Sequence, residues 1–200
     1  MPFYGWGVNK KLLILRKLKI FLTLVCLLFA LPAFCQEVFR IENGIKYDES
    51  RVQPFMRTLL FKNDFVVAFR TCFQGEAASE SRYFVLTGRG EELKAYLYSG
   101  TSGVLNDLHL SSYSMNQIWK TFQQNDLFRI RDEKDIANFC AKKYEIYESY
   151  TYEFTILSQG KMKVLSYYSP EYYIEACYGI SERLNIINSV AIINFYAHQK

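Results

Sequence analysis

Two stretches decide the fold: residues 84–99 read FVLTGRGEELKAYLYS, and residues 154–169 read FTILSQGKMKVLSYYS. In each stretch an apolar run leads into a glycine-containing turn and a second apolar run comes after it, which is the pattern of a β-hairpin. Each hairpin is succeeded by a segment with helical features. The second stretch begins about 70 residues after the first, so the pattern suggests a duplicated β-β-α unit.

The flanking residues extend this pattern on both sides. Aromatic and β-branched residues at 64–73 predict a further strand, and residues 150–156 alternate as a half-buried strand should. Pro54 can open a helix over 55–61, although a strand fits there too. Ser114 and Gln117 have the spacing of a capping box, which predicts a helix from there to about Gln124. Ser169 and Pro170 fit the N-cap and first position of another helix.

The last predicted helix begins at Ser181. Its apolar stripe comprises Leu184, Ile187, Ala191 and Phe195, flanked by Ile186, Val190 and Ile193. Strand runs separated by helices predict an α+β fold, in which an antiparallel sheet of two hairpin units is covered on one face by helices.

The N-terminus has the order of a secretory signal. Residues 1–35 carry five basic residues and no acidic one, then the apolar run 20–31, then Pro32 and Ala33-Phe34-Cys35. We therefore predict a cleavable signal peptide at 1–35, a mature chain that starts at Gln36, and export to the periplasm or the medium. Two alternatives are an uncleaved anchor, for which the run is short, and lipidation at Cys35, which Phe34 disfavours.

Residues 36–200 are then a single domain of ordinary size. The full chain has 24 basic and 20 acidic residues, but the signal removes five of the basic ones, so the mature chain is close to neutral. This composition gives no reason to expect nucleic-acid binding, which needs a clustered basic face. We also expect no membrane span after signal cleavage.

Three cysteines remain in the mature chain: Cys72, Cys140 and Cys177. In an oxidising compartment one disulfide and one leftover thiol are expected, and the sequence cannot choose among the three pairings. The alternative is that all three are small buried side chains. Their spacing fits neither a CxxC redox pair nor a zinc site, so we expect no metal and no cofactor.

Catalytic motifs are missing from the sequence. There is no nucleophile elbow, HExxH or phosphate-binding glycine loop, and the histidines, His109 and His198, stand apart from any nucleophile pattern. We therefore expect an exported, non-catalytic binding or structural protein. The alternative is a secreted, glycosidase-like hydrolase that uses carboxylates. Its candidates are Glu145, Glu148 and Glu153.

Tyrosines favour a binding role instead, because nine of them fall between residues 144 and 178. The candidate binding surface comprises Tyr167, Tyr168, Tyr172 and Tyr173. Tyr167 shares a strand face with Lys161 and Lys163, so it is predicted to be the exposed member. The partner of such a surface would be an exported or cell-surface protein, or a carbohydrate on which the rings stack.

The string from Tyr167 to Tyr173, together with residues 183–188 reading RLNIIN, resembles the C-terminal half of small exported uncharacterised proteins of Gram-negative bacteria. The resemblance covers roughly residues 114–195. It implies export and the strand-strand-helix plan, and it carries over no functional residue.

Overall fold

The computed structural model describes residues 41–74, 81–136, 146, 149–176 and 181–197. All the elements below belong to one compact unit, Arg40–Lys200. Within the described ranges the strands form one antiparallel sheet of seven strands, in the order β1-β7-β6-β2-β3-β4-β5. The strands are β1 (Ile45–Lys46), β2 (Phe65–Phe73), β3 (Arg82–Arg89), β4 (Glu92–Ser99), β5 (Val104–Asp107), β6 (Tyr150–Ser158) and β7 (Lys161–Tyr168).

Both predicted hairpins are present. Between β6 and β7, Gln159 and Gly160 have φ of 50° and 70°, so a two-residue turn with left-handed backbone matches the twist of the two strands. Between β3 and β4 the turn is at Gly90, with φ of 58°. The second hairpin joins the first through β2, which pairs with β3 on one side and with β6 on the other.

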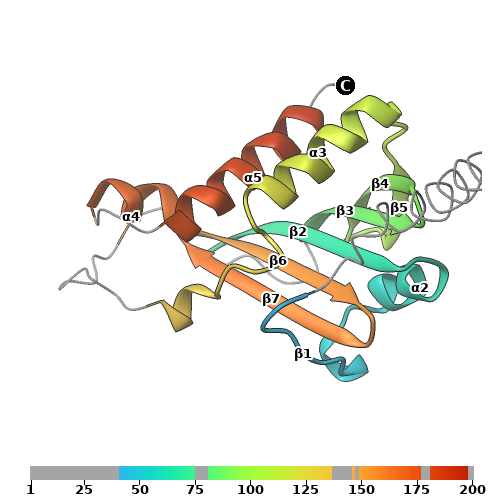
Figure 1. Cartoon of the computed structure of the whole chain (residues 1–200), viewed down its shortest axis with the longest axis horizontal. Helices are drawn as coiled ribbons and strands as arrows, with labels where there is room; N and C mark the ends of the chain where they lie inside the picture. Colours follow the sequence, from blue (N-terminus) through green and yellow to red (C-terminus); the bar gives the residue numbers. More distant parts are fainter. Residues whose placement is uncertain (1–40, 75–80, 137–145, 147–148, 177–180, 198–200) are drawn as a thin grey trace, which may run out of the picture. The chain divides into compact units, whose positions relative to one another are not determined.

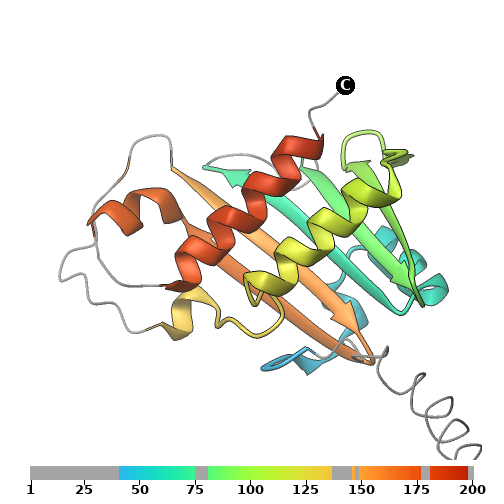
Figure 2. The ribbon, with the colours of Figure 1, turned by 45° about the horizontal axis from the view of Figure 1, so that its top comes forward.

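The helices are α2 (Pro54–Lys62), α3 (Ser112–Gln124), α4 (Pro170–Ala176) and α5 (Ser181–Ala197). Helices α3 and α5 lie side by side across one face of the sheet (Figures 1 and 2). There Trp119 stacks on Phe65, with ring centroids 4.7 Å apart, and Phe122 meets Phe154 edge-on. The α+β fold, with an antiparallel sheet and helices packed on it, is therefore confirmed.

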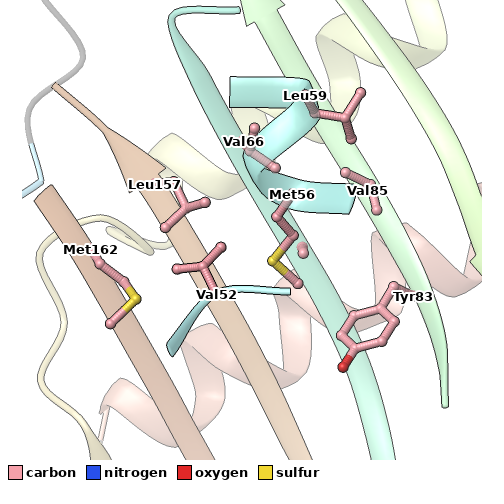
Figure 3. Close-up of a cluster of buried hydrophobic side chains, with 9 residues drawn as sticks. Val52, Met56, Leu59, Val66, Tyr83, Val85, Leu157 and Met162 are labelled. Carbon is pink, nitrogen blue, oxygen red and sulfur yellow. The ribbon is translucent and has the colours of Figure 1, made fainter. Parts of the chain in front are cut away.

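Helix α2 packs on the opposite face of the sheet. Successive side chains of β2 point to opposite faces, so every second one points toward α2 and the others toward α3 and α5. Met56 and Leu59 of α2 lie against Val66 and Val85, and Figure 3 shows this buried cluster. Strands β2, β3 and β6 are therefore apolar on both of their faces in this region.

Two predicted helix caps differ from the structure, and one strand was missed. Helix α3 begins at Ser112 and its cap is Ser111, whose hydroxyl accepts the N–H of Ser114 at 3.1 Å. The spacing predicts Ser114 as the cap, but the serine three residues earlier takes that role. Ser169 precedes α4 as predicted, and its carbonyl accepts the N–H of Tyr173 at 3.3 Å, but its hydroxyl donates to the carbonyl of Tyr150 at 3.4 Å. Strand β5 was not predicted, because it has only four residues and comes after a glycine-rich turn.

The predicted wide stripe of α5 is right at its flank, where Ile186, Val190 and Ile193 are buried, and wrong at its centre. The buried residues are Arg183, Ile186, Ser189, Val190 and Ile193, whereas Leu184 and Phe195 are 51% and 58% exposed. Apolar residues occur on every side of this helix, so their spacing alone does not select the buried side.

The chain continues differently after each hairpin. Strand β4 leads into β5 before α3 begins, whereas α4 starts two residues after β7. A duplicated unit therefore stays a prediction.

Candidate functional site

The four candidate tyrosines lie near one another at the end of β7 and in α4, but they do not form one exposed patch. Tyr167 and Tyr173 are buried, Tyr168 is half-buried, and only Tyr172 among the four is exposed. Tyr173 packs between Tyr168 and Tyr172, with ring centroids 6.2 and 5.6 Å away. Their arrangement is that of a small aromatic core rather than of a stacking platform.

The prediction that Tyr167 is exposed is wrong, because its ring has no exposed surface. Its hydroxyl donates to the backbone carbonyl of Arg131. Burial raises the pKa of this hydroxyl well above its ordinary value. The two lysines on the same strand face misled the prediction, since Lys163 is itself buried there.

A buried arginine holds the tyrosines in place. Arg183 of α5 donates from Nε and Nη2 to Oε1 of Glu133, at 3.0 and 2.8 Å. The other oxygen of Glu133 accepts the backbone N–H of Tyr168 at 2.8 Å, and the guanidinium lies over the ring of Tyr173. Glu133, in the short 3₁₀ helix η4 (Glu133–Asp135), therefore ties α5 to β7.

The described carboxylates near these tyrosines are already bound. Glu171 of α4 accepts hydrogen bonds from the hydroxyls of both Tyr150 and Tyr152. Burial, together with the negative charge of Glu171, raises the pKa of Tyr150 to about 12. Glu153 is held by Nε and Nη2 of Arg70, at 3.0 and 3.1 Å. Neither carboxylate is a free general acid or base.

The structure gives no catalytic or metal-binding arrangement for the remaining glutamates, cysteines and histidines that it describes. Glu145 and Glu148 lie outside the described residues, and so do Cys140, Cys177 and His198. His109 is exposed beside Asp107. No cluster of metal-ligating side chains occurs in the part of the chain that the structure describes. Cys72 lies half-buried on β2, and the disulfide stays a prediction.

A groove that sequence reasoning missed lies beside β7, between β1 and η4, with a volume of about 650 Å³. We call it the β7 groove, and its lining residues are Asn43, Ile45, Arg51, Ile130, Arg131, Asp132, Lys134, Asp135, Met162, Lys163 and Val164. Four of these are cations and two are carboxylates. The groove joins segments about 30 and 80 residues apart in the chain, so no local pattern could reveal it.

Lys163 is the unusual member of this lining. It is only 4% exposed, and its ammonium donates to the backbone carbonyl of Phe128 at 3.1 Å. Among the described residues no carboxylate lies within ion-pair distance of it. Burial lowers the pKa of Lys163 to about 8. An ammonium has three donors, so this side chain retains donors for an anionic group.

Comparison of the chain with protein-family models, with curated proteins and with solved structures finds no match. The resemblance to exported proteins of Gram-negative bacteria therefore stays a prediction, and a function has to be inferred from the geometry of the groove. Among the helices that the structure describes, none has the length and apolar composition of a membrane span.

Proposed function

We propose that this chain is an exported, non-catalytic binding protein whose ligand is a polypeptide segment of an exported or cell-surface protein, held in the β7 groove. The observation that carries the proposal is that the groove runs along β7 beyond its pairing with β1, where no other strand among the described residues pairs with this edge. Strand β1 pairs with β7 only at Met162 and Lys161.

The lining supports a polypeptide over a carbohydrate. Sugar rings need exposed aromatic faces for stacking, and none of the described residues that line the groove is aromatic. The groove instead combines partly exposed aliphatic side chains, Ile45 and Val164, with charged ones. That combination of aliphatic anchors and charges suits a peptide chain.

Export is proposed from the sequence of residues 1–35, with cleavage before Gln36. Mass spectrometry of the protein made in a Gram-negative bacterium should find a mature N-terminus at Gln36. A product that keeps Lys10–Lys19, or that carries a lipid on Cys35, contradicts this part of the proposal.

Binding is tested by site-specific photocrosslinking. A photoreactive phenylalanine analogue placed at Ile45, which is 50% exposed, should form adducts with one or a few exported proteins in intact cells, identified by mass spectrometry. The same analogue at Phe61, an exposed position on α2 away from the groove, is the control. Equal or absent adducts at the two positions contradict the proposal, and an adduct with polysaccharide would favour the carbohydrate.

A further inference from the structure

The outer edge of β7 has backbone groups that point away from β6, both at the groove, which Val164 lines, and just beyond it at Ser166. The N–H of Tyr168 bonds to Glu133 of η4, so it points away from β6, whereas the N–H of Ser169 bonds to Tyr150 at 2.8 Å. Backbone groups alternate in direction along a strand, so those of Ser166 and Val164 also point outward. Within the described ranges no hydrogen bond reaches the outward groups of these two residues.

The chain itself turns away from this edge. Continued pairing of β1 would place Asn43 opposite Val164, but Asn43 has φ of 57°, which ends an extended strand. The N–H of Glu42 then bonds to the carbonyl of Phe128 at 3.2 Å. The open stretch of β7 therefore begins where β1 leaves it and ends where Glu133 caps Tyr168.

The opposite edge of the sheet is less suited to a partner strand. Strand β5 has four residues, and two of them are Asn106 and Asp107. A short edge strand with a charged residue is a common protection against strand addition. Strand β7 has eight residues and an aliphatic side chain, Val164, at the open position; this side chain is 39% exposed.

The side chains beside the open edge specify the pattern of an added strand. A residue opposite Val164 would lie on the sheet face of Val164 and Ile45, where an aliphatic side chain fits. Its neighbours would lie on the other face, beside Lys163. The other cations in the groove already have carboxylate partners. Arg131 is paired with Glu182 and Lys134 with Asp132. Arg51 lies beside Asp48, and the remaining carboxylate, Asp135, belongs to η4.

Lys163 therefore favours an acidic neighbour, because its buried ammonium makes no ion pair among the described residues. The charge of Glu42 acts on it, but that carboxylate is paired with Arg129. It also disfavours a second copy of this chain at the same edge, since that pairing would bring two copies of Lys163 together. The partner strand is then a segment of another protein, in which aliphatic and acidic residues alternate.

We propose that the β7 groove binds an extended acidic segment as an additional antiparallel strand, hydrogen-bonded to Val164 and Ser166, with its carboxylate side chains toward Lys163. This inference rests on the proposed function and specifies its ligand. Strand addition to an open sheet edge draws its affinity from backbone hydrogen bonds and its specificity from alternate side chains.

The probes are two capped octapeptides, one alternating valine and glutamate and one alternating valine and lysine, measured by fluorescence titration against the mature protein. The glutamate peptide should bind and the lysine peptide should bind at least about tenfold more weakly. Val164→Pro removes an outward N–H without touching the hydrogen bonds to β6, and should weaken binding about tenfold. Val164→Ala keeps that N–H and should change binding much less.

A ligand-side variant avoids any effect on folding. In the proposed register the N–H groups of the peptide valines face β7, and those of its glutamates face away. N-methylation of the valines should abolish binding, whereas N-methylation of the glutamates should preserve it.

If the peptide methylated at its valines binds as tightly as the peptide methylated at its glutamates, strand addition is overturned. Equal binding of the glutamate and lysine peptides overturns the acidic ligand, and binding of neither peptide overturns the inference as a whole. These outcomes leave the proposed function standing if Ile45 still crosslinks specifically in cells. Loss of that crosslink removes the proposed function itself.

Discussion

Tyr167 shows how burial at a single residue is set by distant parts of the chain. Its ring is covered, and its hydroxyl bonds to the carbonyl of Arg131. Tyr167→Ala should therefore lower the free energy of unfolding by about 3–5 kcal/mol, because it leaves a cavity. Tyr167→Phe should cost about 1 kcal/mol, the net value of one hydrogen bond.

Urea unfolding of both variants measures these losses, and Tyr172→Ala at an exposed ring is the matched control. Tyr172→Ala should cost less than about 1 kcal/mol. A loss at Tyr167→Ala as small as at Tyr172→Ala would contradict the burial of Tyr167.

Lys163 should make stability depend on pH in the alkaline range. Burial lowers its pKa to about 8 in the folded protein, against 10.5 for an ordinary exposed lysine. Between these two values the unfolded chain binds more protons, so this residue makes the protein more stable as the pH rises from about 8 to about 10.5. Its contribution approaches a slope of about 1.4 kcal/mol per pH unit at most.

The test compares the wild-type protein with Lys163→Met, by urea unfolding at several pH values from 7 to 10. Lys163→Met removes this contribution, so the difference in unfolding free energy between wild type and variant should shift in favour of the wild type as the pH rises. A difference that stays constant with pH would show that Lys163 has an ordinary pKa.

The same two residues explain why the candidate site was not predictable. Alternation correctly placed Tyr167 and Lys163 on one strand face, but a lysine in a strand usually marks the solvated face. Here its ammonium reaches the carbonyl of Phe128, 35 residues away in the chain. That contact depends on how the segment after α3 crosses the sheet, which no local pattern contains.

Among the elements, α5 offers a direct comparison of its two sides. Ile186 is fully buried and Leu184 is 51% exposed, two positions apart on one helix. Ile186→Ala should lower the free energy of unfolding by about 2–5 kcal/mol, and Leu184→Ala by less than about 1 kcal/mol. Chemical unfolding of the two variants tests whether the flank or the centre of the predicted stripe is buried. A larger loss at Leu184 would show that the centre of the stripe packs on the sheet.

The ion pair that attaches η4 to α5 should contribute to the stability of the folded protein. Arg183 is almost completely buried against Glu133, so Glu133→Ala leaves an uncompensated buried cation and should cost about 3–5 kcal/mol. The double variant with Arg183→Met removes that cation, so it should be more stable than Glu133→Ala alone. Thermal or urea unfolding of the single and double variants measures the coupling, and strictly additive losses would contradict it.

For the molecule as a whole, local sequence patterns predicted the elements better than their arrangement. Both hairpins, the strand at 64–73 and the helices after Pro54, Pro170 and Ser181 are found where the patterns indicated them. Their turns and alternation are local properties. The strand order is not local, because the paired residues of β2 and β6 lie between 77 (Phe73 and Tyr150) and 93 (Phe65 and Ser158) positions apart in the chain. The β7 groove results from that order and from the turn at Asn43, so it was not predicted either.

The position of β2 between β3 and β6 has a consequence for how the protein is made. The first strands form by local pairing, but β2 keeps one unsatisfied side until residues 150–158 arrive. Contacts this distant in sequence slow folding, typically to milliseconds or longer. During synthesis the N-terminal half of the chain is made first, and its central strand β2 stays open to aggregation until β6 follows.

A fragment of residues 36–149 should therefore fail to fold alone. Size-exclusion chromatography and circular dichroism should show aggregated or unstructured material, whereas the mature chain should be folded under the same conditions. A monomeric fragment that unfolds cooperatively would show that β6 is dispensable. If the fragment fails, the newly made chain stays open to self-association until residues 150–200 have been synthesised.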